Sequence, residues 1–167
     1  TVLDVHLTET SFVHAHFHFV MALFAAFAIF GGIYFWFPKM TGRLADGPLA
    51  TIAFWLNLVG ANVTFWPLFI IGFRGMPRRY YDYEMFQGFE PYHQVATVGA
   101  FITALGVAIM FVNWTYSAIK GKKVENGNPW MAKSLEWTHA PCPVGPGNFP
   151  GEDPKVDETW TPYNYAK

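Results

Sequence analysis

The chain has 167 residues, a length that suits one ordinary domain, and a formal net charge of −1. Hydrophobic residues make up 52% of it, aromatic residues 19% and charged residues only 14%, whereas soluble domains carry about 25% charged residues. This balance predicts a chain solvated largely by lipid, and it excludes a basic nucleic-acid-binding surface. The single cysteine, Cys142, excludes an internal disulfide framework and a multi-thiolate metal site.

The first ten residues include the polar side chains Asp4, His6 and Glu9 and lack a basic region. A secretory signal peptide begins with positive charge followed by an apolar core. These residues therefore do not predict a signal peptide, and we expect the start at Thr1 to be either a cut through a longer polypeptide or the product of a split gene.

Three long apolar runs follow, at residues 12–37, 49–73 and 94–119. A helix of about 25 residues reaches about 37 Å, at a rise of about 1.5 Å per residue. A hydrocarbon core of about 30 Å needs roughly 20 residues. We therefore predict an all-α, polytopic membrane protein with three transmembrane helices. The alternative, a buried helix of a large soluble protein, is disfavoured because three such runs leave too little polar surface.

Small residues recur within these runs. Membrane helices approach each other closely where side chains are small, so we predict helix–helix contacts at these positions. Pro67 lacks an N–H group and is expected to kink the second helix near its end. The small residues are Gly31, Gly32, Gly60, Ala61, Gly99 and Gly106.

The basic residues near the helix ends predict an orientation. Those that follow the first and third helices are expected on one side, which the positive-inside rule makes the cytoplasmic or matrix side. They are Lys39, Arg43, Lys120, Lys122 and Lys123. The loop at residues 74–93 is then outside. Its three arginines, Arg74, Arg78 and Arg79, predict an anionic partner beside the membrane surface.

From residue 121 onward the chain is polar and rich in proline and glycine. Repeated prolines forbid a long helix. We therefore predict two regions: a three-helix transmembrane region at residues 1–120, and an extended cytoplasmic tail at residues 121–167 that lies against neighbouring protein. The prolines are Pro141, Pro143, Pro146, Pro150, Pro154 and Pro162.

The sequence VHAHFHF at residues 13–19 places three histidines near the start of the first run. On a strand, residues two apart share a face, so His14, His16 and His18 would converge on one metal. On a helix with 3.6 residues per turn, two residues turn by about 200°, and His16 and His18 face nearly opposite sides. Because the run is too long for a strand, we predict a helix, with Phe17 between two separate sites.

Histidine within a membrane span is costly and usually functional. Neutral imidazole is a common axial ligand of haem iron, so His16 and His18 are candidate ligands of two separate metals. The alternative is that the three rings bond to neighbouring helices or to interfacial water.

The wider pattern resembles the C-terminal part of subunit I of the haem–copper terminal oxidases, the cytochrome c oxidase family. The resemblance covers essentially the whole chain and implies the last three helices of a twelve-helix bundle. It rests on segments similar to the tenth helix, to the eleventh helix with its following loop, and to the tail. These are AHFHF (15–19), FAIFGG (27–32) and WFPKMTG (36–42), then NVTF (62–65) and GMPRRY (75–80), then SLEWT (134–138).

The resemblance implies a role for each candidate residue. His16 would be the axial ligand of the high-spin haem that faces copper, and His18 one of two axial ligands of the low-spin haem. Phe17 would lie on the short path between the haems. Arg78 and Arg79 would pair with haem propionates, because the guanidinium fork binds carboxylates and stays charged.

The chain departs from the family at its start. The family usually has His-Asp-Thr before this helix, with the His and Asp contributing to a magnesium site, whereas this chain has Thr8, Glu9 and Thr10. Glu9 could still hold the cation through oxygen. His6 is read as a solvated interfacial residue, and His14 replaces a more usual apolar residue and receives no role.

The resemblance implies a respiratory oxidoreductase, a cytochrome c or quinol oxidase, that reduces dioxygen to water and translocates protons across an energy-transducing membrane. It would work only with the rest of the catalytic subunit, since the copper ligands and the second low-spin ligand lie on earlier helices. Expected partners are those helices, other subunits including the electron-entry subunit, cytochrome c or quinol, and membrane lipid. Type A haem is expected, while types B and O stay open.

Two other hypotheses remain open at this stage. A related nitric oxide reductase would keep the fold and replace copper by iron, with glutamates on the absent helices. A non-catalytic membrane scaffold, or a metal-binding module, would use His14, His16 and His18 together and would need a strand or a broken helix there.

Overall fold

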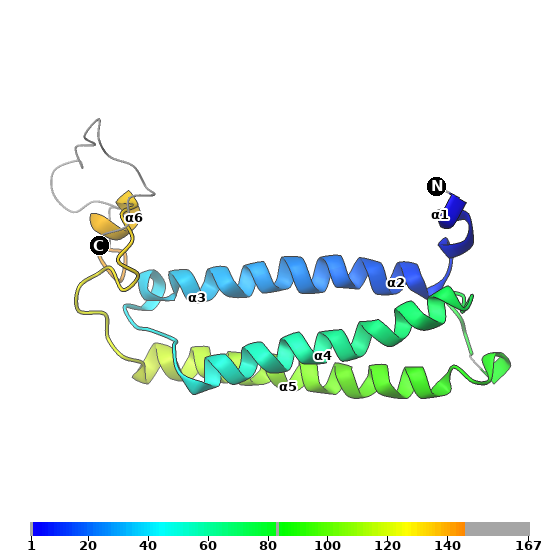
Figure 1. The fold of residues 1–167 in the computed structure, drawn as a ribbon. Helices are drawn as coiled ribbons and strands as arrows, with labels where there is room; N and C mark the ends of the chain where they lie inside the picture. Colours follow the sequence, from blue (N-terminus) through cyan, green and yellow to red (C-terminus); the bar gives the residue numbers. More distant parts are fainter. Residues whose placement is uncertain (1, 83, 146–167) are drawn as a thin grey trace. The chain divides into compact units, whose positions relative to one another are not determined.

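The computed structural model describes residues 2–82 and 84–145 (Figure 1). The described residues are mostly helical and contain no strand, only isolated bridges between Thr10 and Pro77 and between Arg43 and Lys123. The elements are α1 (Val2–Leu7), α2 (Ser11–His18), the π-helix η1 (Phe19–Ala26), α3 (Phe27–Thr41), α4 (Pro48–Phe73), the short 3₁₀ helix η2 (Glu84–Phe86), α5 (Glu90–Lys120) and α6 (Leu135–Thr138).

Three helical stretches are long and apolar enough to cross a membrane: Ser11–Thr41, Pro48–Phe73 and Glu90–Lys120. The first combines α2, η1 and α3. The prediction of an all-α protein with three transmembrane helices is therefore confirmed. The helices extend beyond the apolar runs, and Pro38 and Lys39 are buried inside α3 rather than exposed after it.

The chain divides into two compact units. One contains residues 2–30 and 48–111, and the other contains residues 31–47 and 112–145 of the described chain. The predicted division at residue 120 remains a prediction, and the part of the predicted tail at residues 146–167 lies outside the described residues.

In the first unit, α2 lies beside α4 (Figure 1). The ring of Phe12 on α2 meets the edges of Phe69 and Phe73 on α4, with centroids 5.0 and 4.8 Å away. The backbone of Phe12 comes so close to Gly72 that a Cβ there would overlap it. The start of the first membrane helix is therefore held by aromatic packing around a glycine.

Helices α4 and α5 make the second close contact of this unit. A Cβ on Gly60 would lie 2.5 Å from the hydroxyl oxygen of Thr103 and 2.6 Å from its backbone nitrogen. Gly99 and Gly106 meet Thr64 and Asn57 of α4 in the same way. The predicted small-residue contacts are thus confirmed at these three glycines. They are not found at Gly31, where an added Cβ would have nothing within 4 Å.

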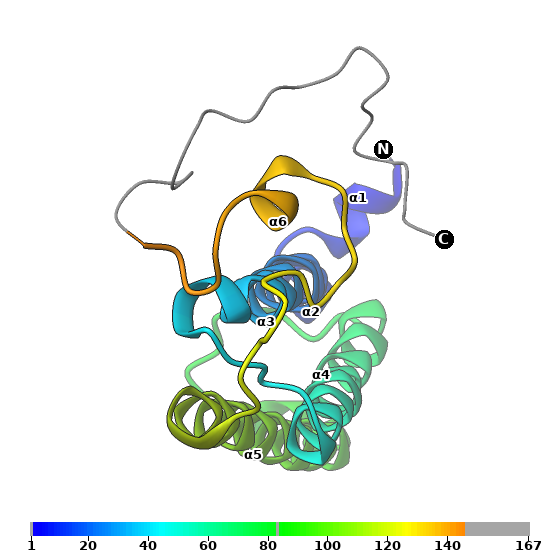
Figure 2. The same cartoon turned by 90° about the vertical axis from the view of Figure 1, so that its left-hand side faces the viewer.

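The second unit joins the end of α3 to the following tail. Backbone bonds link Leu44 N–H to the Lys122 carbonyl at 2.9 Å and Val124 N–H to the Gly42 carbonyl at 3.0 Å. Farther along, α6 turns back over α3 (Figure 2), where Trp137 is 2% exposed and meets the ring of Phe35. The two basic segments expected on one side therefore lie against each other.

Candidate functional site

The histidine segment is helical. Thr10 caps the start of α2, because its side-chain oxygen accepts the Phe12 N–H at 3.2 Å while its hydroxyl donates to the Leu7 carbonyl at 2.7 Å. Residues Ser11–His18 then form an α-helix. The prediction of a helix rather than a strand is therefore confirmed, and it fixes how the three imidazoles are arranged.

His16 and His18 lie in different surroundings. His18 is half-buried and stacks on Phe65 of α4, with ring centroids 5.3 Å apart. His16 is exposed and lies near the ring of Phe12, at 6.3 Å. Phe17, between them in sequence, is 55% exposed. The two rings follow the turn of about 200° expected for residues two apart on a helix.

The imidazole of His18 has a defined tautomer. Its Nδ1 lies 2.9 Å from the backbone carbonyl of His14, one turn earlier. A carbonyl can only accept, so Nδ1 carries the proton and donates it, and Nε2 of the neutral ring keeps its lone pair. A bond of this kind at the other ring nitrogen is the usual way in which a metal-binding histidine is oriented.

The three histidines do not form one metal site. No group of three or more His, Cys, Asp or Glu side chains suited to a metal ion occurs in residues 2–82 and 84–145. His14 and His18 are neighbours, with ring centroids 4.3 Å apart. The backbone that the shared-metal hypothesis required, a strand or a broken helix, is not what this segment adopts.

The helix changes form directly after His18. The eight residues Phe19–Ala26 form a π-helix, whose wider turns are rare and frequently lie at functional sites. The sequence predicts an uninterrupted α-helix here. The segment contains neither glycine nor proline to signal the change.

Glu9 and Arg78 form an ion pair that the sequence pattern did not predict. The Arg78 guanidinium donates to both carboxylate oxygens, from Nε at 2.8 Å and from Nη2. The Arg78 backbone N–H also donates to the Glu9 carbonyl at 2.9 Å. The side-chain hydrogen bond from Arg78 lowers the pKa of Glu9 below its ordinary value. The two segments carry opposite charge, and that was the one available signal.

The ion pair bears on the predicted magnesium ligand. Both carboxylate oxygens of Glu9 face Arg78, and the part of the chain that the structure describes offers no cluster of acidic or imidazole side chains around Glu9. A hard cation needs several oxygen ligands. The structure thus gives Glu9 the Arg78 guanidinium as its partner, and the role of Glu9 as a magnesium ligand stays a prediction.

Arg78 and Arg79 border a cavity of about 340 Å³ at the start of α2. Arg79 is exposed and has a positive φ of 60°, as Glu9 does at 68°. Such backbone is uncommon outside glycine and persists where surrounding structure holds it. The cavity is lined by Ser11, His14, Leu68, Arg78, Arg79 and Tyr80.

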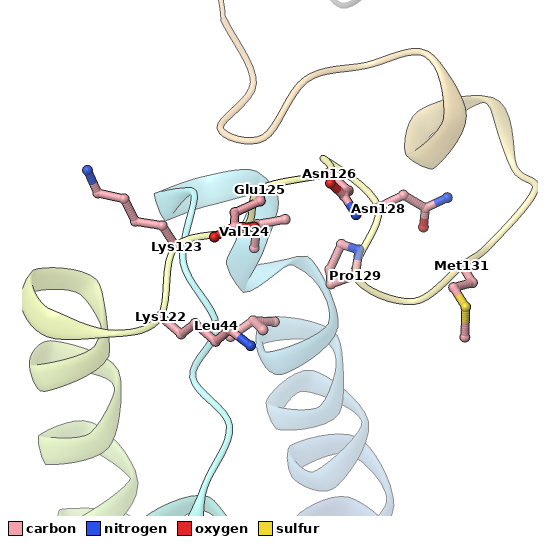
Figure 3. A pocket seen from close by; sticks show the side chains of 9 residues that line it. All are labelled: Leu44, Lys122, Lys123, Val124, Glu125, Asn126, Asn128, Pro129 and Met131. Carbon is pink, nitrogen blue, oxygen red and sulfur yellow. The ribbon is translucent and has the colours of Figure 1, made fainter.

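A second cavity belongs to the other unit and has a different character. Figure 3 shows it between the loop after α3 and the chain after α5, with the Lys123 side chain extending away from the other lining residues. Lys122 and Glu125 are among its lining residues, and none of the candidate ligands is. We assign it no part in the candidate site.

Together, the fold and the site define an integral membrane protein whose first spanning helix presents two imidazoles to different surroundings. The chain matches the family described as "Cytochrome C and Quinol oxidase polypeptide I" over residues 1–102. It therefore belongs to this family, the catalytic polypeptide I of haem–copper oxidases, as the resemblance implied.

Curated relatives agree with this assignment. The chain is 42% identical over 142 residues to "Cytochrome c oxidase subunit 1" of Thermostichus vulcanus, covering 85% of this chain and 25% of the relative. It is 42% identical over 143 residues to the protein of that name from Synechocystis sp., covering 84% and 25%. For Alkalihalophilus pseudofirmus the identity is 37% over 154 residues, covering 92% and 24%. The chain thus spans about a quarter of the length of these relatives.

Proposed function

We propose that this chain is the C-terminal portion of the catalytic subunit of a respiratory haem–copper oxidase, in which His16 and His18 each ligate a different haem. His16 would hold the high-spin haem and His18 the low-spin haem, with Phe17 between them. The oxidase names of its relatives support this proposal, as does the helical histidine segment.

The observation that best supports this proposal is the hydrogen bond made by the His18 ring. Its Nδ1–H is used by the His14 carbonyl at 2.9 Å, which leaves Nε2 as the nitrogen for a metal. The chemistry of this donor fits an axial haem ligand, since axial histidines are neutral and held by a bond at the other ring nitrogen. His16, two residues earlier and turned away, suits a second and separate iron.

The chain's own residues would bind and orient the reactive groups. His16 and His18 fix the separation of the two irons because they share one rigid helix. Phe17 fills the space between them with an apolar ring. Arg78 and Arg79 would hold positive charge beside the propionates, where carboxylates would otherwise repel each other. When bound, the haems and copper supply electron transfer and the reaction O₂ + 4e⁻ + 4H⁺ → 2H₂O.

The remaining parts of the reaction lie outside this chain. The copper ligands, the second low-spin ligand and the proton uptake routes are expected on the earlier helices of the same subunit. Cytochrome c or quinol would donate electrons, in the first case through an electron-entry subunit. We place the tail on the cytoplasmic or matrix side of an energy-transducing membrane, with proton translocation coupled to the reaction.

A pyridine haemochrome spectrum of the purified complex, reduced minus oxidised, tests this function. We expect haem bands, and their positions identify the haem as type A, B or O. A complex that contains this chain and shows zinc or copper without haem absorbance would contradict the proposal and favour a scaffold. Non-haem iron in place of copper would favour the nitric oxide reductase.

A further inference from the structure

The cavity at the start of α2 contains a histidine, His14, that the proposed function leaves unused. Of its six lining residues, Ser11, Arg78, Arg79, Tyr80 and His14 carry polar side chains, and Leu68 does not. Arg78 and Arg79 already have an expected partner. His14 has none, because neither the sequence pattern nor the proposed function gives it a role.

The hydrogen bonds around the cavity show which donors are already used. Glu9 takes the Nε and Nη2 edge of Arg78, the edge that forms a bidentate bond with a carboxylate. The Ser11 hydroxyl donates to the Pro77 carbonyl at 3.3 Å. The Ser11 N–H donates to the Met76 carbonyl at 2.8 Å. One of the two bidentate edges of the Arg78 guanidinium is therefore occupied by the protein itself.

Two donor groups on this cavity stay available. Among residues 2–82 and 84–145, no hydrogen bond or ion pair involves the guanidinium of Arg79 or a ring nitrogen of His14. Both side chains are exposed in the isolated chain. His14 lies one helical turn before His18, about 6 Å along the axis at about 1.5 Å per residue, and the two rings touch.

We propose that His14 is a further cofactor-binding residue, which donates a hydrogen bond from its ring to a carboxylate of the group ligated by His18, beside Arg79. Together these residues form a carboxylate-binding pair that replaces the edge of Arg78 used by Glu9. The inference rests on the proposed function, because the carboxylate is a haem propionate.

The geometry favours the low-spin haem over the other. His14 and His18 are four residues apart and share a face of α2, whereas His16 is turned away from both. His14 lies one turn from the proposed axial ligand and lines the same cavity as the arginines, so it would bind the same haem as His18. The backbone carbonyl of His14 also orients His18, so one residue would hold both the ligand and the propionate.

The test uses the assembled oxidase complex and the midpoint potential of the low-spin haem, measured by spectroelectrochemical titration. His14→Val removes the donor, His14→Gln keeps a donor, and His6→Val makes the same change on the exposed helix α1. Arg79→Gln removes the second member of the pair. Arg74→Gln makes the same charge change outside the cavity, at a side chain that is exposed and lies 5.3 Å from the ring centre of Tyr92.

We expect His14→Val and Arg79→Gln to lower the potential, because an unpaired propionate stabilises ferric iron, and to shift the propionate bending band in resonance Raman spectra. His14→Gln should retain most of the wild-type potential, and Arg74→Gln and His6→Val should change it less than their partners in the cavity do. A His14→Val potential equal to that of wild type overturns the inference. If His14→Val does not assemble, His14→Ala removes the same donor, and a wild-type potential together with a wild-type propionate band in that variant also overturns it.

The pyridine haemochrome of every variant separates this inference from the proposed function. A wild-type complex without haem contradicts both. If the His14→Val complex has a normal haem content and its low-spin potential and propionate band equal those of wild type, only the inference is contradicted.

Discussion

Two histidines are exposed in the histidine segment, Ser11–His18, but a lysine is buried where the chain after α5 packs on the end of α3. At the tail, Lys39 is 7% exposed, and its amino group donates to the Ala140 carbonyl at 2.7 Å and lies 4.7 Å from the Trp137 ring centre. In α2, His14 and His16 are exposed. The polar group at the tail is thus satisfied by residues of the same chain, whereas the histidine segment exposes two of its imidazoles.

The difference fits the proposed function, in which the histidine segment holds the haems. A buried ammonium is tolerated only when hydrogen bonds and a π-face replace its water, and the tail supplies both locally. The imidazoles of α2 have one fixed bond, from His18 to the His14 carbonyl, and ring nitrogens that can bind something else. Substitutions in the two regions should therefore change different observables.

The largest effect is expected from the axial ligands. His18→Ala should abolish the low-spin haem signal and His16→Ala the high-spin signal, because each removes the imidazole that this chain offers to that iron. Reduced-minus-oxidised optical spectra of the purified complex measure both. His6→Ala is the control and should leave both signals intact. If either ligand variant kept wild-type spectra, the ligand assignment would be wrong.

In the tail, Trp137→Ala should cost about 3–5 kcal/mol of local stability, the usual cost of removing a buried large aromatic side chain. Trp137 is 2% exposed and packs on Phe35 and Lys39. We expect faster tryptic cleavage of the tail with haem spectra unchanged. His139→Ala, an exposed neighbour, is the matched control. Loss of haem without faster cleavage would break the contrast between the regions.

Between the helices, Gly60→Ala should destabilise the protein by about 1–3 kcal/mol, since overpacking a close contact forces a backbone shift. The new methyl group would lie 2.6 Å from the Thr103 backbone nitrogen. Thermal unfolding of the complex in detergent measures the change. Gly31→Ala, where nothing lies within 4 Å, should be neutral or stabilising by up to about 1 kcal/mol. Equal effects at both glycines would contradict the close α4–α5 contact.

The smallest effect concerns the Glu9–Arg78 ion pair, which is exposed and therefore weak. The Arg78 hydrogen bond lowers the pKa of Glu9, so the pair stabilises the fold above the ordinary pKa of a glutamate. This stabilisation is lost as the pH falls through the lowered folded-state value. We expect hydrogen exchange at the Arg78 amide, relative to a Glu9→Gln variant, to be slower at pH 7 and to converge in acid. If the ratio of the wild-type exchange rate to the Glu9→Gln exchange rate did not change with pH, the ion pair would be ruled out in solution.

Much of the site could be predicted from the sequence because its determinants are local. The length of the apolar runs predicts three spanning helices, and the spacing of His16 and His18 on a helix determines that they face different sides. None of these features depends on a distant part of the chain.

The features that the sequence did not predict, the ion pair at Glu9 and the burial of Lys39, depend on contacts between residues far apart in the chain. Glu9 and Arg78 are 69 positions apart, and Lys39 and Ala140 are 101 positions apart, so no periodicity or spacing connects them. The charge of the loop predicted an anionic partner, and the resemblance implied propionates for Arg78 and a cation for Glu9. Only the folded loop shows that the two side chains bind each other. The sequence by itself determined where the three long helices lie and that His16 and His18 face different sides, because helical hydrogen bonding and side-chain period are local. The tertiary structure decided which charges pair, which lysine is buried and which donors border the cavity, because those depend on how the helices pack.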